Sequence, residues 1–318
     1  MSHVKVLAVA VLSAVSFVGF GGSSVSLRPG GAEVLVAPTA PKTVRFAADD
    51  LTNHLSQVLG AAVPVVTAPT DGKVQIVVGD SEWSRAAGID VAKLPRDGFV
   101  LRTSAGRVYV VGRDDPAEDL GKKLSQGAYP ATEHATAFGV MEFLERYAGV
   151  RFYYPDEYGT IVPRKASVEV AATDETVKPR FTTRRSGLRG AGPCGELPLG
   201  PGQDVRKAWW RFRLREGTVN IPCCHGQNRF GVVKLFTKTH PEYFQLRKDG
   251  TRCTETSADV GYKIGQLCHT SGVWDFFRSA TVERMRKGEK YVDVMPQDGM
   301  RACLCENCLK RYSQTNDF

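Results

Sequence analysis

The sequence lacks the short motifs that identify several common enzyme classes. It contains no H-E-x-x-H zinc-protease motif, no phosphate-binding P-loop and no G-x-S-x-G nucleophile motif. The stretch from Gly190 to Gly195 matches G-x-G-x-x-G, but Pro193 lies inside it and two further prolines follow. Because a dinucleotide-binding motif needs a helix at that place, we interpret the stretch as a loop. Enzymes that depend on any of these motifs are therefore excluded.

Long apolar runs are also missing, apart from one near the N-terminus. Val6 to Val18 is an apolar run of 13 residues, Lys5 precedes it, and small residues follow as far as Ser26. A membrane-spanning helix needs about 20 apolar residues, so the run is too short to span a bilayer. Its arrangement is typical of a secretory signal peptide, and no cysteine near its end supports a lipid anchor. We expect residues 1–26 to be a signal peptide and the mature protein to be secreted or periplasmic, without stable membrane insertion.

Acidic residues are scarce between residues 178 and 230. This stretch holds eleven Lys or Arg but only three Asp or Glu, a surplus equal to the net charge of +8 of the whole chain. In an exported protein the surplus favours an acidic ligand, such as a uronate or a sulfated sugar, and we expect no nucleic-acid partner. The alternative for residues 206–215 is a solvated helix face, because their basic side chains flank an apolar stripe. Arg185 lies outside that helix and is a candidate ligand-binding residue.

Residues 27–172 alternate between short apolar segments and two longer segments with helical periodicity. The expected strands are 33–37, 63–67, 74–78, 99–102, 108–111, 151–154 and 167–170, and the expected helices are 43–59 and 135–148. A turn at 103–107 joins two of the strands into a hairpin, and Gly149 ends the second helix. We expect an α+β domain, followed by a linker at 172–179.

Residues 178–318 show a different order, in which a strand is repeatedly followed by a helix. The expected strands are 181–188, 218–224, 262–268 and 291–296, and the expected helices are 203–215, 232–244 and 272–287, with a fourth beginning at 306–312. Such a series favours an α/β architecture, a parallel sheet with helical crossovers. A complete eight-stranded barrel takes about 250 residues. Only 141 residues remain from Lys178 to Phe318, so we expect a partial (β/α) barrel of about four units, truncated at its C-terminal end.

Polar residues follow three of the expected strands of the second domain. His225, His269 and Asp298 come after the second, third and fourth strands. Because barrel enzymes keep their active sites at the carboxyl ends of the strands, we expect these side chains to face one rim. Asp298 is the first candidate for a catalytic residue, and Gln297 before it is a candidate for binding the substrate.

The loop after His225 continues with Gln227, Asn228 and Arg229, which can bind sugar hydroxyls or a carboxylate. Cleavage of a glycosidic bond needs a protonated carboxyl group and a second carboxylate. Asp298 can supply one of these groups. Glu196, on the loop after the first strand, is either the partner or a solvated side chain.

Seven of the eight cysteines lie between residues 223 and 308, and three of them form the compact motif Cys303-x-Cys305-x-x-Cys308. An even number of cysteines in an exported chain favours disulfides. The spacing of the motif also suits a structural zinc with a fourth ligand from Cys268, Cys223 or His225, and free thiols are a third alternative. The expected chemistry requires no other cofactor. A nucleophilic Cys223 or Cys224 beside His225 is a weaker interpretation.

Several blocks of sequence resemble known families. The blocks of the first domain are Asp97-Gly-Phe-Val-Leu-Arg, Gly106-Arg-Val-Tyr-Val-Val-Gly112, Ala137-Phe-Gly-Val-Met-Glu-Phe-Leu-Glu145 and Gly149-Val-Arg-Phe-Tyr-Tyr-Pro155. They resemble the N-terminal domain of bacterial alpha-glucuronidases, also described as beta-hexosaminidase domain 2-like. The blocks of the second domain are His225, His240-Pro-Glu-Tyr-Phe244, Asp249-Gly250, Gln266-Leu-Cys268 and Gln297-Asp298-Gly299 with the cysteine motif. They resemble a bacterial family of unknown function that follows this N-terminal domain in large secreted proteins.

The resemblance implies a glycoside-hydrolase-like barrel that acts on complex polysaccharides, with the first domain as a companion. Hexosaminidases use an Asp-Glu pair at the fourth strand, whereas this chain has Gln297-Asp298. This difference argues against substrate-assisted cleavage of an N-acetyl sugar. His269 stands where the unknown-function family has an uncharged residue, so it ranks below His225.

The sequence therefore predicts a secreted, glycoside-hydrolase-like protein that acts on an oligo- or polysaccharide, with a uronate as the candidate sugar. In this hypothesis Asp298 is the general acid or base, His225 and Arg229 position the sugar, and the cysteine motif fixes the loop behind Asp298. The alternative is a non-catalytic carbohydrate-binding or scaffold protein, or an inactive fragment of a larger hydrolase.

Overall fold

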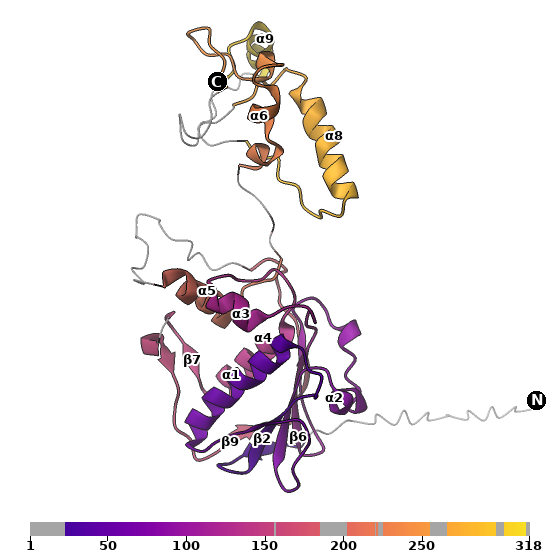
Figure 1. Cartoon of the computed structure of the whole chain (residues 1–318), viewed down its shortest axis with the longest axis vertical. Coiled ribbons are helices and arrows are strands. Elements are labelled where there is room, and N and C mark those ends of the chain that lie inside the picture. The colour runs from indigo at the N-terminus through magenta and orange to yellow at the C-terminus, as the bar shows by residue number, and fades with distance from the viewer. Residues whose placement is uncertain are drawn as a thin grey trace, which may run out of the picture. The chain divides into compact units, whose positions relative to one another are not determined.

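The computed structural model describes residues 23–155, 157–184, 202–219, 221, 225–254, 266–296 and 302–315 (Figure 1). The chain forms two compact units, Met1–Val219 and Asn220–Phe318. Most of the expected signal peptide lies outside the described residues. Its last residues are described and belong to the fold. Val25–Leu27 forms strand β1, and Val25 and Leu27 are buried in the core of the first unit.

A six-stranded mixed sheet is the centre of the first unit, in the order β10-β5-β6-β4-β2-β3. The strands are β2 (Ala32–Leu35), β3 (Val65–Val66), β4 (Val74–Val78), β5 (Phe99–Ser104), β6 (Arg107–Gly112) and β10 (Asp174–Val177). Strands β3, β2, β4 and β6 are parallel, whereas β5 pairs antiparallel with both β6 and β10. The expected hairpin of β5 and β6 is therefore confirmed.

Helices cover one face of this sheet. Helix α1 (Lys42–Leu59) and helix α4 (Ala135–Phe143) lie side by side on that face, and a π-helical turn, Leu144–Ala148, extends α4 (Figure 1). The turn ends at Gly149, whose φ of 79° is the left-handed conformation that glycine adopts most easily. The two long helices expected from the sequence are thus confirmed.

Alternate residues of the strands face two separate apolar layers, as the pleat of a strand requires. Val34, Ile76 and Val110 belong to the large core beneath α1 and α4. Leu35 and Val77 belong to a smaller core on the other face. The short elements α2 (Glu82–Ala86) and η1 (Val91–Lys93) contribute partly buried apolar side chains to that smaller core.

Short elements complete the first unit. They are α3 (Leu120–Ser125), β7 (Arg151–Phe152), η3 (Glu157–Gly159), β8 (Thr160–Ile161) and β9 (Val168–Val170). Strand β9 pairs antiparallel with β1, and β7 pairs antiparallel with β8.

The first unit extends beyond the boundary expected from the sequence. Strand β10 lies within the expected linker at 172–179, and its pairing with β5 makes it an edge strand of the central sheet. Helix α5 (Gln203–Arg213) was expected to belong to the second domain. Its residues Ala208 and Phe212 are instead buried in the core of the first unit, which therefore continues to Val219.

Arginines of the basic stretch bind carboxylates within this unit. Arg213, with 13% of its side chain exposed, places Nη2 2.7 Å from Oδ1 of the buried Asp50. Arg211 Nε lies 2.6 Å from Glu216 Oε2. These arginines are neither a solvated helix face nor a site for an acidic ligand, because the protein supplies their anionic partners.

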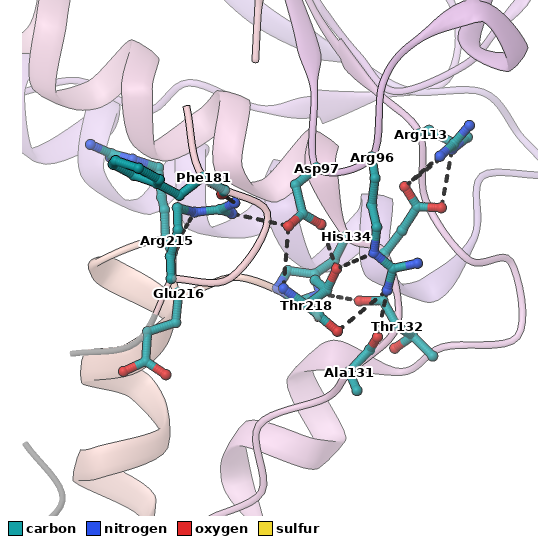
Figure 2. Close-up of polar contacts among 12 residues, drawn as sticks. Arg96, Asp97, Arg113, Ala131, Thr132, His134, Phe181, Arg215, Glu216 and Thr218 are labelled. Atoms are coloured by element: carbon teal, nitrogen blue, oxygen red, sulfur yellow. Dashed lines mark hydrogen bonds and ion pairs between the residues drawn. The ribbon is translucent and has the colours of Figure 1, made fainter. Parts of the chain in front are cut away.

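A second polar cluster connects the residues after α5 to residues 96 and 97 of the first unit. Asp97 accepts hydrogen bonds from Thr218, and Arg96 donates to Thr218 Oγ1 at 3.0 Å and to the carbonyl oxygen of Ala131 at 2.9 Å (Figure 2). Arg184 Nη2 lies 3.0 Å from Asp97 Oδ2 and completes the cluster. Arg184 is thus held by protein groups as well.

The second unit contains short helical elements around a small core. They are η4 (Gly226–Phe230), α6 (Val232–Phe236), η5 (Pro241–Tyr243), α8 (Val273–Arg286) and α9 (Glu306–Thr315). Phe230, Phe244 and Phe277 are central to the core. The expected helix at 232–244 ends at Phe236, and Pro241, which cannot continue an α-helix, starts the 3₁₀ turn.

The described residues of this unit do not form the expected partial barrel. They contain no ladder strand, and their β-pairing is limited to the isolated bridges Phe244↔Leu267 and Leu246↔Arg252. The expected fourth strand, 291–296, is fully described and forms no β-strand. The Asp293 carboxylate accepts a hydrogen bond from Met295 N–H at 2.8 Å, so its side chain occupies a backbone donor that ladder pairing would use. The other expected strands lie partly outside the described residues.

Among the residues that the structure describes, no helix has both the length and the apolar character needed to cross a membrane.

Candidate functional site

Four cysteines converge in the second unit. Cys268 follows the bridge at Leu267, Cys303 and Cys305 precede α9, and Cys308 lies in its first turn. All four sulfur atoms lie within 4.8 Å of one another. Cys268 Sγ is 3.6 Å from both Cys305 Sγ and Cys308 Sγ. Cys305 is half-buried and the other three are buried, so the cluster is a compact group of sulfur ligands shielded from solvent.

A short backbone segment, residues 243–246, brings the two cysteine-bearing segments together. Cys268 N–H donates to the carbonyl oxygen of Tyr243 at 2.8 Å, and Gln245 N–H donates to that of Gln266 at 2.7 Å. On its other side, the carbonyl oxygen of Leu246 accepts a hydrogen bond from Leu304 N–H at 3.0 Å. The cysteines are therefore positioned by backbone pairing as well as by their own spacing.

Hydrogen-bond donors surround the sulfur atoms. Leu246 N–H donates to Cys303 Sγ at 3.3 Å, and Thr270 Oγ1 lies 3.3 Å from Cys308 Sγ. Tyr312, one turn after Cys308, accepts a hydrogen bond from Cys303 N–H at 3.2 Å. Such contacts orient sulfur ligands and stabilise negative charge on them.

The thiols have different acidities. Burial raises the pKa of Cys268, and it raises the pKa of Cys303 to about 12. Burial also acts on Cys305, but hydrogen bonds from Cys308 N–H, Thr270 and the neighbouring thiols outweigh it and lower the Cys305 pKa to about 6.

His225 and the 3₁₀ helix η4 that follows it, together called the His225 loop, form a second group of candidate residues. Gly226 packs so closely on Asp293 that an added Cβ would lie 2.1 Å from the Asp293 carbonyl oxygen. Gln227 is buried, and its N–H donates to the carbonyl oxygen of Met295 at 3.2 Å. The loop therefore lies directly against the segment that leads to Gln297 and Asp298.

The comparison with protein families gives two matches. A family model described as a domain of unknown function, DUF4838, matches residues 154–317, which is more than half of the chain. The chain belongs to the DUF4838 family. A model of the glycosyl hydrolase family 67 N-terminus matches residues 31–118 of this DUF4838 protein. Both resemblances expected from the sequence are confirmed by these matches.

Solved glycoside hydrolases are also similar to this DUF4838 protein. BtGH115A, a family GH115 4-O-methyl-alpha-glucuronidase with specificity for decorated arabinogalactans, is 20% identical, with a TM-score of 0.37, over 76% of this chain and 29% of that chain. The GH20 beta-N-acetylhexosaminidase of Streptomyces coelicolor A3(2) is 16% identical, with a TM-score of 0.33, over 52% of this chain and 25% of that chain. The DUF4838 protein thus spans less than a third of the length of either enzyme. No curated protein matches the chain.

The structure places some of the predicted residues of this DUF4838 protein, and others lie outside the described residues. His225, Gln227 and Arg229 share one loop, with Arg229 exposed. His269 lies beside the cysteines, where its Nδ1 is 3.0 Å from the Tyr312 hydroxyl. Asp298, Gln297, Arg185, Glu196, Cys194, Cys223 and Cys224 lie outside the described residues.

Sequence reasoning missed Thr270 and Tyr312, the polar neighbours of the cysteines. Tyr312 follows Cys308 by four residues, so a helical reading of α9 places both on one face, and this signal was present in the sequence. Thr270 follows Cys268 by two residues, but its hydroxyl contact with Cys308 depends on the fold. Cys253, the described cysteine outside the cluster, accepts a hydrogen bond from Arg247 Nη2 at 3.2 Å.

Proposed function

We propose that this protein binds a complex polysaccharide through the His225 loop and hydrolyses a glycosidic bond in it, with Asp298 as the general acid or base. The observation that carries the proposal is the contact of the loop with residues 293–295, made by Gly226 and by the Gln227–Met295 hydrogen bond. Asp298 follows Met295 by three residues. The match to the glycosyl hydrolase family 67 N-terminus supports carbohydrate as the substrate class.

The proposed roles follow from the chemistry of each group. A carboxyl group of Asp298 protonates the leaving oxygen or activates water, and a second carboxylate completes the reaction. The Arg229 guanidinium, which is exposed on the loop, can bind a sugar carboxylate through two parallel hydrogen bonds. His225 positions hydroxyl groups beside it.

A uronate-containing substrate is the specific form of the proposal. The arginines at 184, 211 and 213 are bound by protein groups, so they no longer support an acidic ligand. Arg229 and Arg185 are the cationic residues on which a uronate preference now rests. The proposal of a uronate is abandoned if the protein cleaves neutral oligosaccharides while leaving glucuronosyl ones intact.

The test compares the wild type with Asp298→Asn in the full-length protein, on a panel of glucuronosyl and neutral polysaccharides. We expect release of reducing ends by the wild type and loss of turnover, with retained binding, in Asp298→Asn. Asp275→Asn is the matched control, because the Asp275 side chain is 74% exposed on α8 and pairs only with Arg278 among the ion pairs described there. Unchanged turnover in Asp298→Asn removes Asp298 from the mechanism. Binding without turnover in every form favours a non-catalytic carbohydrate-binding protein.

A further inference from the structure

The separations within the cysteine cluster fit one metal ion. A tetrahedral site with zinc–sulfur bonds of about 2.3 Å holds its sulfur atoms about 3.8 Å apart. The distances from Cys268 Sγ to Cys305 Sγ and Cys308 Sγ are 3.6 Å, and all four sulfurs lie within 4.8 Å of one another. A disulfide needs a sulfur–sulfur distance of about 2.05 Å, which neither of these pairs approaches.

We propose that Cys268, Cys303, Cys305 and Cys308 bind a single zinc ion. Four sulfur ligands complete a tetrahedral shell and leave no position for water or substrate, which is the arrangement of a structural site. The surroundings suit zinc-bound thiolates, since Leu246 N–H and the Thr270 hydroxyl lie at hydrogen-bond distance from two of the sulfurs. Backbone N–H groups of Thr270 and Cys308 point at Cys268 and Cys305 in the same way.

The proposed ion explains how this unit holds together. In the described residues of the second unit, the β-pairing consists of isolated bridges and the apolar core is small. The ion joins the segment ending in Cys268 to the start of α9, and residues 243–246 hydrogen-bond to both. Metal binding of this kind contributes directly to the free energy of folding.

Zinc is favoured over the other metals that bind four thiolates. Four cysteine ligands accept zinc, a single iron or an iron–sulfur cluster. The compact group of sulfurs suits a mononuclear ion, since a cubane cluster separates its ligands further. The proposed role of the ion is structural, and zinc can perform it because zinc has no redox chemistry.

The experiment measures bound metal on the full chain, purified without chelator, by inductively coupled plasma mass spectrometry. We expect about one zinc per chain in the wild type, and loss of most of it in Cys305→Ser and Cys308→Ser. Cys253→Ser is the matched control, because Cys253 is a buried cysteine of the same unit outside the cluster. This variant should keep its zinc.

Two further measurements keep the proposal testable if a variant fails to fold. Cobalt exchanged into the wild type should give the intense visible bands of a tetrahedral tetrathiolate site. Denaturing mass spectrometry without reductant should give the mass of the fully reduced cluster. A disulfide between two of the four cluster cysteines in a metal-free chain, located by peptide mapping, would overturn the proposal, and so would iron in place of zinc, or zinc retained by a folded Cys308→Ser variant.

Discussion

The buried carboxylate of Asp97 accepts two hydrogen bonds from Thr218, one from the hydroxyl at 2.6 Å and one from the backbone N–H at 3.2 Å. The two residues are 121 positions apart, so the contact holds the end of the first unit against its sheet domain. Asp97 has a φ of 59°, a backbone conformation that a non-glycine residue adopts only when its contacts favour it. Arg96 donates a hydrogen bond to Thr218 of this pair (Figure 2). Arg184 binds the Asp97 carboxylate.

Replacing the Thr218 hydroxyl tests the strength of this connection. Thr218→Val keeps the shape of the side chain but leaves the buried Asp97 carboxylate with one donor fewer, so we expect a loss of about 1–3 kcal/mol in the free energy of unfolding. Urea denaturation of the wild type and the variant measures the loss. Thr176→Val is the control, since Thr176 is exposed on β10 and its change should stay within about 0.5 kcal/mol. Equal losses of unfolding free energy in both variants would show that the Thr218–Asp97 hydrogen bond adds no stability of its own.

His134 makes the stability of the first unit dependent on pH. Burial lowers the pKa of His134 to about 4, and its ring is packed against Phe138 with its Nδ1 2.8 Å from the Thr132 carbonyl oxygen. Because the folded pKa is below the unfolded value of about 6.5, the stabilisation is complete above pH 6.5 and is lost as pH falls toward 4. The loss should be on the order of 3 kcal/mol, seen as a falling urea midpoint.

The His134→Gln variant should show a flatter dependence on pH over the same window, whatever its stability at neutral pH. His240→Gln is the control, because His240 is half-exposed in the second unit and pairs with Glu242. If His134→Gln retains the full slope of the wild type between pH 6.5 and 4, another group causes it.

Local sequence patterns predicted the long elements and failed on those defined by distant pairing. Helix α1 and strands β4 to β6 were expected because apolar residues recur at the spacing of each element. Strand β1 has three residues, and it is a strand because it pairs with β9, more than 140 residues later. Such pairing leaves no mark within a short window of sequence.

In the candidate site too, local sequence predicted some features, whereas others depend on contacts between distant segments. The spacing Cys303-x-Cys305-x-x-Cys308 indicated a metal or disulfide cluster, but Cys268, Cys223 and His225 were equal candidates for the fourth position. The contact of Cys268 with this motif depends on hydrogen bonds of residues 243–246, which bring two distant segments together. The alternation at 291–296 suggested a strand, but the Asp293 side chain bonds Met295 N–H and competes with ladder pairing.

Trp274 offers a local probe of the proposed zinc site. Its indole N–H lies 3.2 Å from the Cys268 carbonyl oxygen and 3.1 Å from that of His269, and the other three tryptophans belong to the first unit. Removal of the metal by a chelator should free the cluster, expose the indole and shift its fluorescence to longer wavelength. Adding zinc back should reverse the shift, and Trp274→Phe should abolish it. If a chelator removes bound zinc and leaves the emission spectrum unchanged, the ion does not maintain the structure around Trp274.

Gly226 tests whether the His225 loop must lie against residues 293–295 for glycan binding. An alanine Cβ at this position would lie 2.1 Å from the Asp293 carbonyl oxygen, a backbone atom that cannot rotate away, so the loop must shift. We expect Gly226→Ala to weaken binding of the best polysaccharide of the panel by about tenfold, or about 1.4 kcal/mol, in isothermal titration calorimetry. Gly272→Ala is the control in the same unit, because the nearest atom to its added Cβ is the Tyr243 hydroxyl at 3.4 Å, an ordinary contact. If Gly226→Ala binds the polysaccharide as tightly as the wild type does, the loop is not part of the glycan site. This conclusion holds whether or not Asp298 is catalytic, because the substitution displaces the loop in either case.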